Sequence, residues 1–408
     1  MRLPIVLASL LAASAAQAAP LTYAAALDAA QRNSPSLQAR ALQVESARAA
    51  SRAAGALPDP KLAFGLDNFP VTGPPAGRFN EESMTMARVG VVQDMPNGAK
   101  RAAERARAQT DIEAAAAAEQ VGARDVRTAA ARAWIDLYYA KRRLSAIDDL
   151  LKSLDPLWNS APSAVASGSE RPAQALEAEQ MRADLQDRRS EIQAAVGRAR
   201  ADLARWTGDA QAEVTGSPPA FEVDAVSLRA ALAGHPQLAE REAVTAQAQA
   251  EVRLAQAQKR PDWSWELAYQ RRDPRFGDMV SAGVTVSLPL FAARRQDPII
   301  AAKLASAAQA RADAEATRLE LAAQLEARLA DHLMRLDQWS RAKDVLLPLA
   351  ERRADLETVS YGAGRGGLTD VLQAFTALAN AQLTFLDREA AVAADAATLV
   401  LAYGSDRP

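Results

Sequence analysis

The run of residues from Ala99 to Trp158 constrains the fold of this chain more than any other feature. Almost all of these residues favour helix, and about sixty residues of continuous helix would reach about 90 Å. A compact soluble domain has no use for a helix of that length. Small and apolar side chains recur along it at intervals of three and four, as in the seam of a coiled coil, at Ala130, Ala133, Leu137, Ala140, Leu144, Ile147, Leu151, Leu154 and Trp158. Long helices packed closely side by side are therefore predicted.

The same plan occurs twice along the sequence. RNSPSLQAR in the first half is echoed by AGHPQLAER in the second, and LARWTG and LVLAYG end at Gly208 and Gly404. These two glycines are 196 positions apart (404 − 208), and so are Gly168 and Gly364 (364 − 168). We therefore predict a tandem duplication in which each half contains a helix, two strands, a long helix, a turn and a further helix.

The predicted boundaries follow from this duplication. Residues 1–18 are expected to form a signal peptide, 19–208 the first repeat, 209–222 a linker and 223–404 the second repeat. The elements expected in the first repeat are strands at 61–68 and 84–93 and helices at 99–159 and 170–208. Those expected in the second are strands at 263–271 and 279–288 and helices at 292–361, with a kink at Pro348, and at 368–403.

The amino-terminal residues have the pattern of a secretory signal peptide. Arg2 precedes an apolar run, and Ala16-Gln17-Ala18 supplies a small-x-small cleavage pattern. The run is too short to anchor the chain in a membrane. The chain contains no cysteine, which excludes a lipid-anchor cysteine, disulfides and thiolate metal ligands. A net charge of −2 with well-mixed signs argues against a nucleic-acid partner. We expect an exported protein.

The predicted strands each have one apolar and one polar face. DWSWELAYQ alternates Trp263, Trp265, Leu267 and Tyr269 with polar or small residues, and MVSAGVTVSL alternates in the same way. Lengths of about nine to eleven residues suit tilted membrane strands. This pattern alone leaves soluble hairpins packed on helices equally open, whereas export and the long helices favour the membrane. The four strands of one chain would leave unpaired edges in lipid, so several chains must each donate their four strands to one barrel.

Together these features resemble the outer-membrane efflux channels of the TolC type. The resemblance rests on the duplicated plan, on Pro96 and Pro289 after the second strand of each pair, and on YGAGRGGLTDVLQA, residues 361–374. Within the family, LPDPKLAF and VVQDMPNGAKR are most similar to the heavy-metal cation branch, of the cobalt–zinc–cadmium and copper–silver type.

The resemblance implies a mainly α fold with transmembrane β structure. It implies a homotrimer whose strands close one barrel in outer-membrane lipid, continued by a periplasmic α-barrel of long helices. The implied partners are a periplasmic adaptor, or membrane fusion protein, and an inner-membrane proton-driven transporter of the RND type. The chain would be a passive duct of a Gram-negative bacterium, without catalytic residues, cofactor or metal site, exporting heavy-metal cations. A drug or other organic-solute channel of the same family and a secreted periplasmic coiled-coil adaptor or scaffold are the alternatives.

The segment GAGRGG, residues 362–367, also fits the G-x-G-x-x-G pattern of dinucleotide-binding loops. Such a loop follows a parallel strand and opens a helix, but the residues before this segment are charged and helical. We therefore expect a turn between two helices. Glycine would cap the first helix, and Thr369 or Asp370 would begin the second.

The resemblance assigns roles to residues around this turn. Tyr361 and Asp370 match a tyrosine and an acid of the periplasmic gate, Gln373 takes the place of a second acid, and Arg365 lies one place before an expected arginine. A ring of Asp370 carboxylates around the pore and a helix-capping role for Asp370 both stay open. The outermost tip residues, expected either to contact the adaptor or only to form turns, are Ser167, Gly168, Ser169, Ala363 and Gly364.

Overall fold

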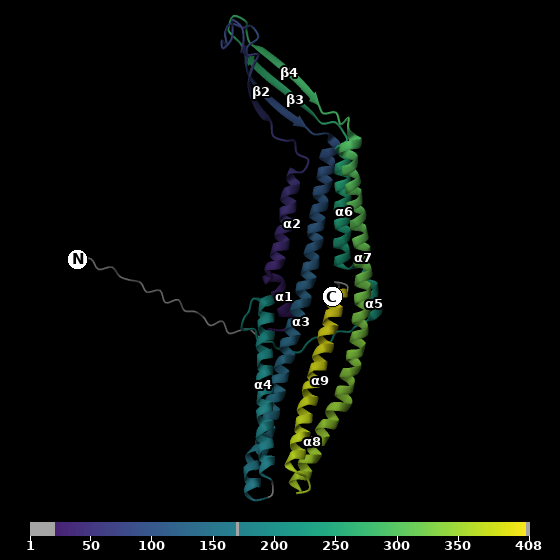
Figure 1. The fold of residues 1–408 in the computed structure, drawn as a ribbon. Helices are drawn as coiled ribbons and strands as arrows, with labels where there is room; N and C mark the ends of the chain where they lie inside the picture. The colour runs from purple at the N-terminus through teal and green to yellow at the C-terminus, as the bar shows by residue number, and fades with distance from the viewer. Residues whose placement is uncertain (1–20, 169–170, 405–408) are drawn as a thin grey trace, which may run out of the picture. The chain divides into compact units, whose positions relative to one another are not determined.

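A computed structural model describes residues 21–168 and 171–404. The predicted signal peptide and Ser169 lie outside the described residues. The described chain is mostly helical with one four-stranded antiparallel sheet, which confirms the predicted fold class (Figure 1). The helices are α1 Tyr23–Asn33, α2 Pro35–Ala53, α3 Gly98–Ala166, α4 Pro172–Thr207, α5 Ala225–Ala231, α6 Pro236–Ala257, α7 Ala292–Arg341, α8 Leu347–Gly362 and α9 Leu368–Tyr403, with a 3-10 turn η1 Leu232–Gly234 and a π-helical turn η2 Ala342–Leu346. The strands are β1 Lys61–Asp67, β2 Met86–Met95, β3 Trp263–Arg271 and β4 Met279–Val286.

Prolines account for the main differences between the predicted and observed helices. Helices α1 and α2 are separate because Ser34, which precedes Pro35, has an extended backbone with ψ 114°, and the residue before a proline disfavours the α conformation. Helix α3, in contrast, continues through Pro156 to Ala166, beyond the predicted end at residue 159. Trp158 and Ala161 are buried there, so packing outweighs the cost of proline. The second long helix is interrupted by the π turn η2, just before Pro348.

The chain divides into two compact units, each of which takes segments from both predicted repeats. The unit that we call the tip unit comprises Met1–Pro35, Ala123–Ala233 and Ala322–Pro408. The second, the sheet unit, comprises Ser36–Gly122 and Gly234–Leu321. The duplication is a relation along the sequence and does not coincide with these units, so it stays a prediction.

The sheet places the apolar residues of its strands on one face. Its strand order is β1-β2-β3-β4, and one row of paired residues runs from Leu62 through Val91 and Leu267 to Ala282. Because side chains alternate along each strand, this register gathers the apolar positions together. The resulting apolar sheet face is exposed and consists of Leu62, Phe64, Leu66, Val89, Val91, Trp263, Trp265, Leu267, Tyr269, Val280, Ala282, Val284 and Val286.

The opposite face of the sheet is polar and carries ion pairs. Arg88 lies 3.1 Å from Glu266 and 3.3 Å from Asp67, and Lys61 lies 2.6 Å from Asp94. The outer edges of β1 and β4 have no strand partner within the described ranges. The sheet is therefore amphipathic and open at both edges.

Asn97 of the motif VVQDMPNGAKR contacts Asp262 of KRPDWSWEL, residues 259–267, where the sheet joins the helices. Asp262 accepts hydrogen bonds from the Asn97 backbone N–H at 2.7 Å and from its side-chain amide at 2.8 Å. Partial burial opposes ionisation of Asp262, but these hydrogen bonds and the Lys100 ammonium outweigh it and lower the pKa of the carboxyl group. Asn97 and Asp262 therefore have a structural role: their hydrogen bonds hold the sheet to the helices at this junction.

The tip unit contains a deeply buried aromatic centre, the Trp134 cluster. Trp134 is 0% exposed, stacks on Tyr138 with ring centroids 5.5 Å apart, and meets the edge of Tyr23 at 5.6 Å. Its indole N–H donates to the Leu21 carbonyl at 2.9 Å. Part of the predicted linker 209–222 packs here as well, because Phe221 contacts Tyr23. That segment is thus tied to the core of the unit.

A second hydrophobic cluster, the tip cluster, lies further along the same helices toward the turns. Its buried members come from α3, α4, α8 and α9 and include Ile147, Leu150, Leu154, Trp158, Ala161, Ala178, Met181, Leu185, Ala354, Leu368, Leu372, Ala374, Leu378 and Ala379. The coiled-coil seam predicted for the first long helix contributes most of its α3 members. None of the described helices combines the length and apolar character needed to cross a bilayer.

Candidate functional site at the helical tips

Two helix–helix turns lie at the same end of the tip unit (Figure 1). One joins α3 to α4 around Gly168, and the other joins α8 to α9 around Gly364. Both glycines have left-handed backbones, with φ 75° and φ 71°, which a residue with a Cβ adopts only at a cost. The GAGRGG segment is thus a turn preceded by helix α8, without the strand that a dinucleotide-binding loop requires.

Asp370 caps the start of α9. One of its carboxylate oxygens accepts a hydrogen bond from the Gly367 N–H at 3.2 Å, while the residue is exposed. In the other turn, the side-chain oxygen of Gln174 accepts from the Arg171 N–H at 2.8 Å. Gln174 is the counterpart of Asp370 at the predicted repeat distance (370 − 196). An amide serves the same cap as the carboxylate, so capping does not require the charge of Asp370.

A second acid lies at the tips, and the sequence interpretation missed it. The Thr369 hydroxyl donates to the Glu177 carboxylate at 2.7 Å, which ties the start of α9 to α4. Glu177 is exposed and is the repeat counterpart of Gln373 (373 − 196). The acid that is missing at Gln373 is thus present at the equivalent place in the first half. The repeat spacing was the signal that could have found it.

The other predicted tip residues differ in how firmly they are held. Tyr361 is half-buried and packs against the tip cluster. Arg365 is exposed and forms no ion pair with another described residue, so the structure gives it no tying contact within one chain. Gln373 is also exposed. The tip residues Ser167, Gly168, Ala363 and Gly364 are all exposed.

An open groove runs between α4 and α9 beside these turns, with a volume of ≈ 700 Å³. Its floor includes the buried apolar side chains of Met181, Leu185 and Leu372. Its walls carry polar side chains, among them Glu177 and Gln373. The groove therefore offers an apolar floor with polar rims on the outside of the helical pair.

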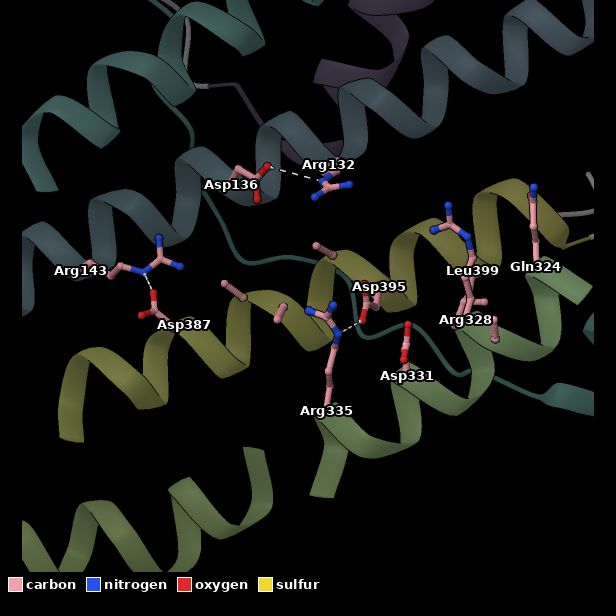
Figure 2. Close-up of a pocket in the computed structure, with 14 residues that line it drawn as sticks. Arg132, Asp136, Arg143, Gln324, Arg328, Asp331, Arg335, Asp387, Asp395 and Leu399 are labelled. Atoms are coloured by element: carbon pink, nitrogen blue, oxygen red, sulfur yellow. Dashed lines mark ion pairs between the residues drawn. The ribbon is translucent and has the colours of Figure 1, made fainter. Parts of the chain in front are cut away.

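A second pocket of the tip unit, of ≈ 600 Å³, is lined by α3, α7 and α9 and is rich in arginine and aspartate (Figure 2). Arg143 lies 2.5 Å from Asp387, Arg335 lies 2.7 Å from Asp395, and Arg132 lies 3.9 Å from Asp136. Figure 2 shows these pairs across and along the helices. Because these carboxylates already face guanidinium groups, the pocket is poorly suited to a cation.

The histidines do not form a metal site. His332 is buried on α7, where desolvation lowers its pKa, and His235 caps α6 by accepting from the Gln237 N–H at 3.2 Å. Within residues 21–168 and 171–404, no group of three or more His, Cys, Asp or Glu side chains could hold a metal ion.

Comparison with known proteins bears on both the fold and the sequence. Residues 227–405 match the family model described as "Outer membrane efflux protein". No curated protein sequence matches the chain.

Solved structures of outer-membrane channels match nearly the whole chain in fold. A structure of CusC matches with a TM-score of 0.79 and 16% identity, over 95% of this chain and 93% of CusC. The Campylobacter jejuni CmeC outer membrane channel matches with a TM-score of 0.80 and 14% identity, over 94% and 85%. VceC from Vibrio cholerae matches with a TM-score of 0.77 and 18% identity, over 94% and 96%. The chain therefore has the fold of the outer membrane efflux proteins, and its second half carries their sequence pattern.

Proposed function

We propose that this protein is the outer-membrane channel of a tripartite efflux pump, a passive duct without catalytic chemistry. The observation that carries the proposal is the amphipathic sheet. Its exposed apolar face would face lipid and its ion-paired polar face would line a water-filled lumen. In water, an exposed apolar face of this size would promote aggregation, and such patches mark surfaces that contact protein or membrane.

The two open edges of the sheet support assembly with further copies. Unpaired backbone groups at β1 and β4 would be costly in hydrocarbon, and a single four-stranded sheet cannot enclose a lumen. Pairing β1 of one chain with β4 of the next would satisfy both edges. We propose a homotrimer, in which three such sheets close one barrel and the long helices continue it into the periplasm. A periplasmic adaptor and an RND-type transporter of the inner membrane would complete the pump.

We propose that the helical tips form the periplasmic mouth of the duct, with the turns at Gly168 and Gly364 contacting the adaptor. Asp370 would then place one carboxylate per chain near the pore. Its exposure supports this role. The uncharged Gln174 makes the equivalent cap in the other turn, so the charge of Asp370 is not needed for capping. Carboxylates from several chains around one axis attract cations.

Replacing Asp370 by glutamine tests this role without removing the cap. We expect Asp370→Gln to shift the reversal potential measured in planar bilayers under a salt gradient toward lower cation preference, because the charge is lost while the Gly367 N–H keeps an acceptor. The matched control is Gln174→Glu, which adds a charge at the counterpart position and should raise cation preference. Equal selectivity of Asp370→Gln and the wild type would contradict a pore-lining Asp370.

We propose heavy-metal cations as the exported substrates, on the likeness of LPDPKLAF and VVQDMPNGAKR to that branch and on the tip acids Asp370 and Glu177. Asn97 of the second motif bonds to Asp262 in a structural junction, so substrate choice would lie in the transporter. A strain lacking the gene should become hypersensitive to zinc, cadmium, cobalt, copper or silver. Hypersensitivity to drugs and dyes instead would replace the metal proposal by an organic-solute channel of the same family.

A further inference from the structure

The sequence contains a single Asn-Gly step, Asn97-Gly98, and this step lies at the junction of the sheet with the helices. Asparagine is a chemically labile residue, and a following glycine makes it most reactive, because the absence of a Cβ lets the backbone nitrogen approach the asparagine side chain. In deamidation, the Gly98 nitrogen attacks the side-chain carbonyl carbon of Asn97. The bond from that carbon to the amide nitrogen breaks, and ammonia leaves with the Gly98 proton. Water then opens the succinimide ring to aspartate or isoaspartate.

In the folded chain, hydrogen bonds hold both ends of the Asn97 side-chain amide. Its oxygen accepts from the Lys100 N–H at 2.8 Å, which caps the start of α3. Its nitrogen donates to a carboxylate oxygen of Asp262 at 2.8 Å and lies 3.3 Å and 3.2 Å from the carbonyl oxygens of Ala257 and Arg260. These contacts fix the orientation of the side chain, so it cannot rotate onto the next backbone nitrogen. Folding therefore protects Asn97 from deamidation.

Gly98 is not required by the local fold. It is exposed, its backbone is not left-handed, and a Cβ at this position would meet no atom of the described residues within 4 Å. In the echoing segment TVSLPLFAARR, Phe291 and Ala292 take the places of Asn97 and Gly98. Helix α7 begins at Ala292, so the corresponding helix starts with a residue that has a Cβ. The main consequence of glycine at position 98 is thus the reactivity of Asn97.

The product of deamidation does not fit the junction. A carboxylate at position 97 has no hydrogen to donate to the Ala257 and Arg260 carbonyls, and it would stand against the half-buried carboxylate of Asp262. The Lys100 ammonium, 3.4 Å from Asp262, would then face two carboxylates. Aspartate still serves as a helix cap, so the damage falls on the contact between sheet and helices.

We propose that Asn97 is a conformation-dependent deamidation site. Its amide is retained while the sheet is seated on the helices, and it is converted to a carboxylate in chains whose junction is open. Because the conversion is irreversible and its product does not fit, it removes such chains from the folded population. The proposal rests on the junction alone and does not depend on the proposed channel function.

Peptide mapping by mass spectrometry of the purified full-length protein tests this proposal. The protein is incubated in mildly alkaline buffer, either folded in detergent or unfolded in guanidinium chloride, and is then digested with trypsin, which releases Asn97 in the peptide 89–100. We expect conversion of Asn97 to be at least about tenfold slower in the folded protein, because the reaction requires the junction to open. Asn380, an exposed residue followed by alanine, is the internal reference and should convert slowly in both states.

Gly98→Ala is the matched control for the reactivity. In denaturant, its Asn97 should convert about tenfold more slowly than that of the wild type, because the added Cβ hinders attack. The folded variant should melt at or slightly above the wild-type temperature, since alanine favours helix. Equal conversion in the folded and unfolded wild type, or equal conversion of Gly98→Ala and the wild type in denaturant, would overturn the proposal. So would a strongly lowered melting temperature of Gly98→Ala, because the glycine would then serve the fold.

Asn97→Asp supplies the converted side chain directly and tests its effect on the junction. We expect this variant to melt several degrees below the wild type in detergent, as followed by circular dichroism. Asn97→Asp combined with Asp262→Asn restores one amide and one carboxylate at the contact and should regain part of the loss. Asn97→Asp that melts with the wild type would overturn the claim that deamidation breaks the junction. A combined variant that regains nothing would overturn the role given to the Asp262 carboxylate.

Discussion

Arginine in place of Ala282 is expected to abolish stable insertion of this protein into the outer membrane. Ala282 lies in the middle row of the apolar sheet face, paired with Leu267. In the proposed barrel it would face lipid near the bilayer midplane, where an arginine costs about 2–4 kcal/mol per chain. Because an assembly of three chains would carry the substitution three times, the effect on insertion would be large.

The neighbouring residue provides a matched control for this substitution. Ser281 is equally exposed on β4 but lies on the polar face, so Ser281→Arg would project into the aqueous lumen and should be tolerated. The measurement is the amount of each variant recovered in the outer-membrane fraction after separation of the two membranes by density. Equal recovery of Ala282→Arg and Ser281→Arg would contradict a lipid-facing apolar face and favour a sheet that packs against protein.

The largest loss of folding stability is expected from Trp134→Ala. The side chain is fully buried among Tyr23, Tyr138 and residues of α1, α3, α4 and α9, and removing a buried tryptophan side chain costs about 3–5 kcal/mol. Trp134→Phe keeps most of the packing and loses the hydrogen bond to the Leu21 carbonyl, at a cost of about 1 kcal/mol from the bond itself.

The unfolding temperature in detergent, followed by circular dichroism, measures both effects. Trp134→Ala should melt several degrees below the wild type, with Trp134→Phe between them. Trp265→Ala serves as the control, because Trp265 is 38% exposed on the apolar sheet face and its removal leaves little cavity in detergent. If Trp134→Ala melted with the wild type, the Trp134 cluster would not be the stabilising centre of the tip unit.

Local patterns predicted the elements of this fold better than the connections between them. Strict alternation from Trp263 to Tyr269 predicted a strand and its apolar face, because a two-residue period is the pattern of a half-buried strand. The pairing of β2 with β3 could not be read in the same way, because it joins residues far apart in sequence, such as Val91 and Leu267. Nothing in either strand alone specifies its partner.

The irregular features needed packing information that sequence patterns hold only indirectly. Pro348 predicted a kink, but the observed irregularity is a π turn that precedes the proline, after which Leu347 packs against the tip cluster. The five-residue spacing between Ala342 and Leu347, in place of the usual three or four, was the sequence signal for this turn. At the tips, the turn glycines follow from their need for left-handed backbones. The Glu177–Thr369 contact joins two halves of the chain and became visible only in the structure.

The central claim is that the amphipathic sheets and long helices of several copies form one continuous duct. Conductance of the purified full-length protein in a planar lipid bilayer tests this claim most directly, with insertion confirmed in parallel by flotation with lipid vesicles. The account predicts discrete, reproducible conductance steps from the inserted protein. Wild-type protein that floats with the vesicles but leaves the bilayer electrically silent would contradict it.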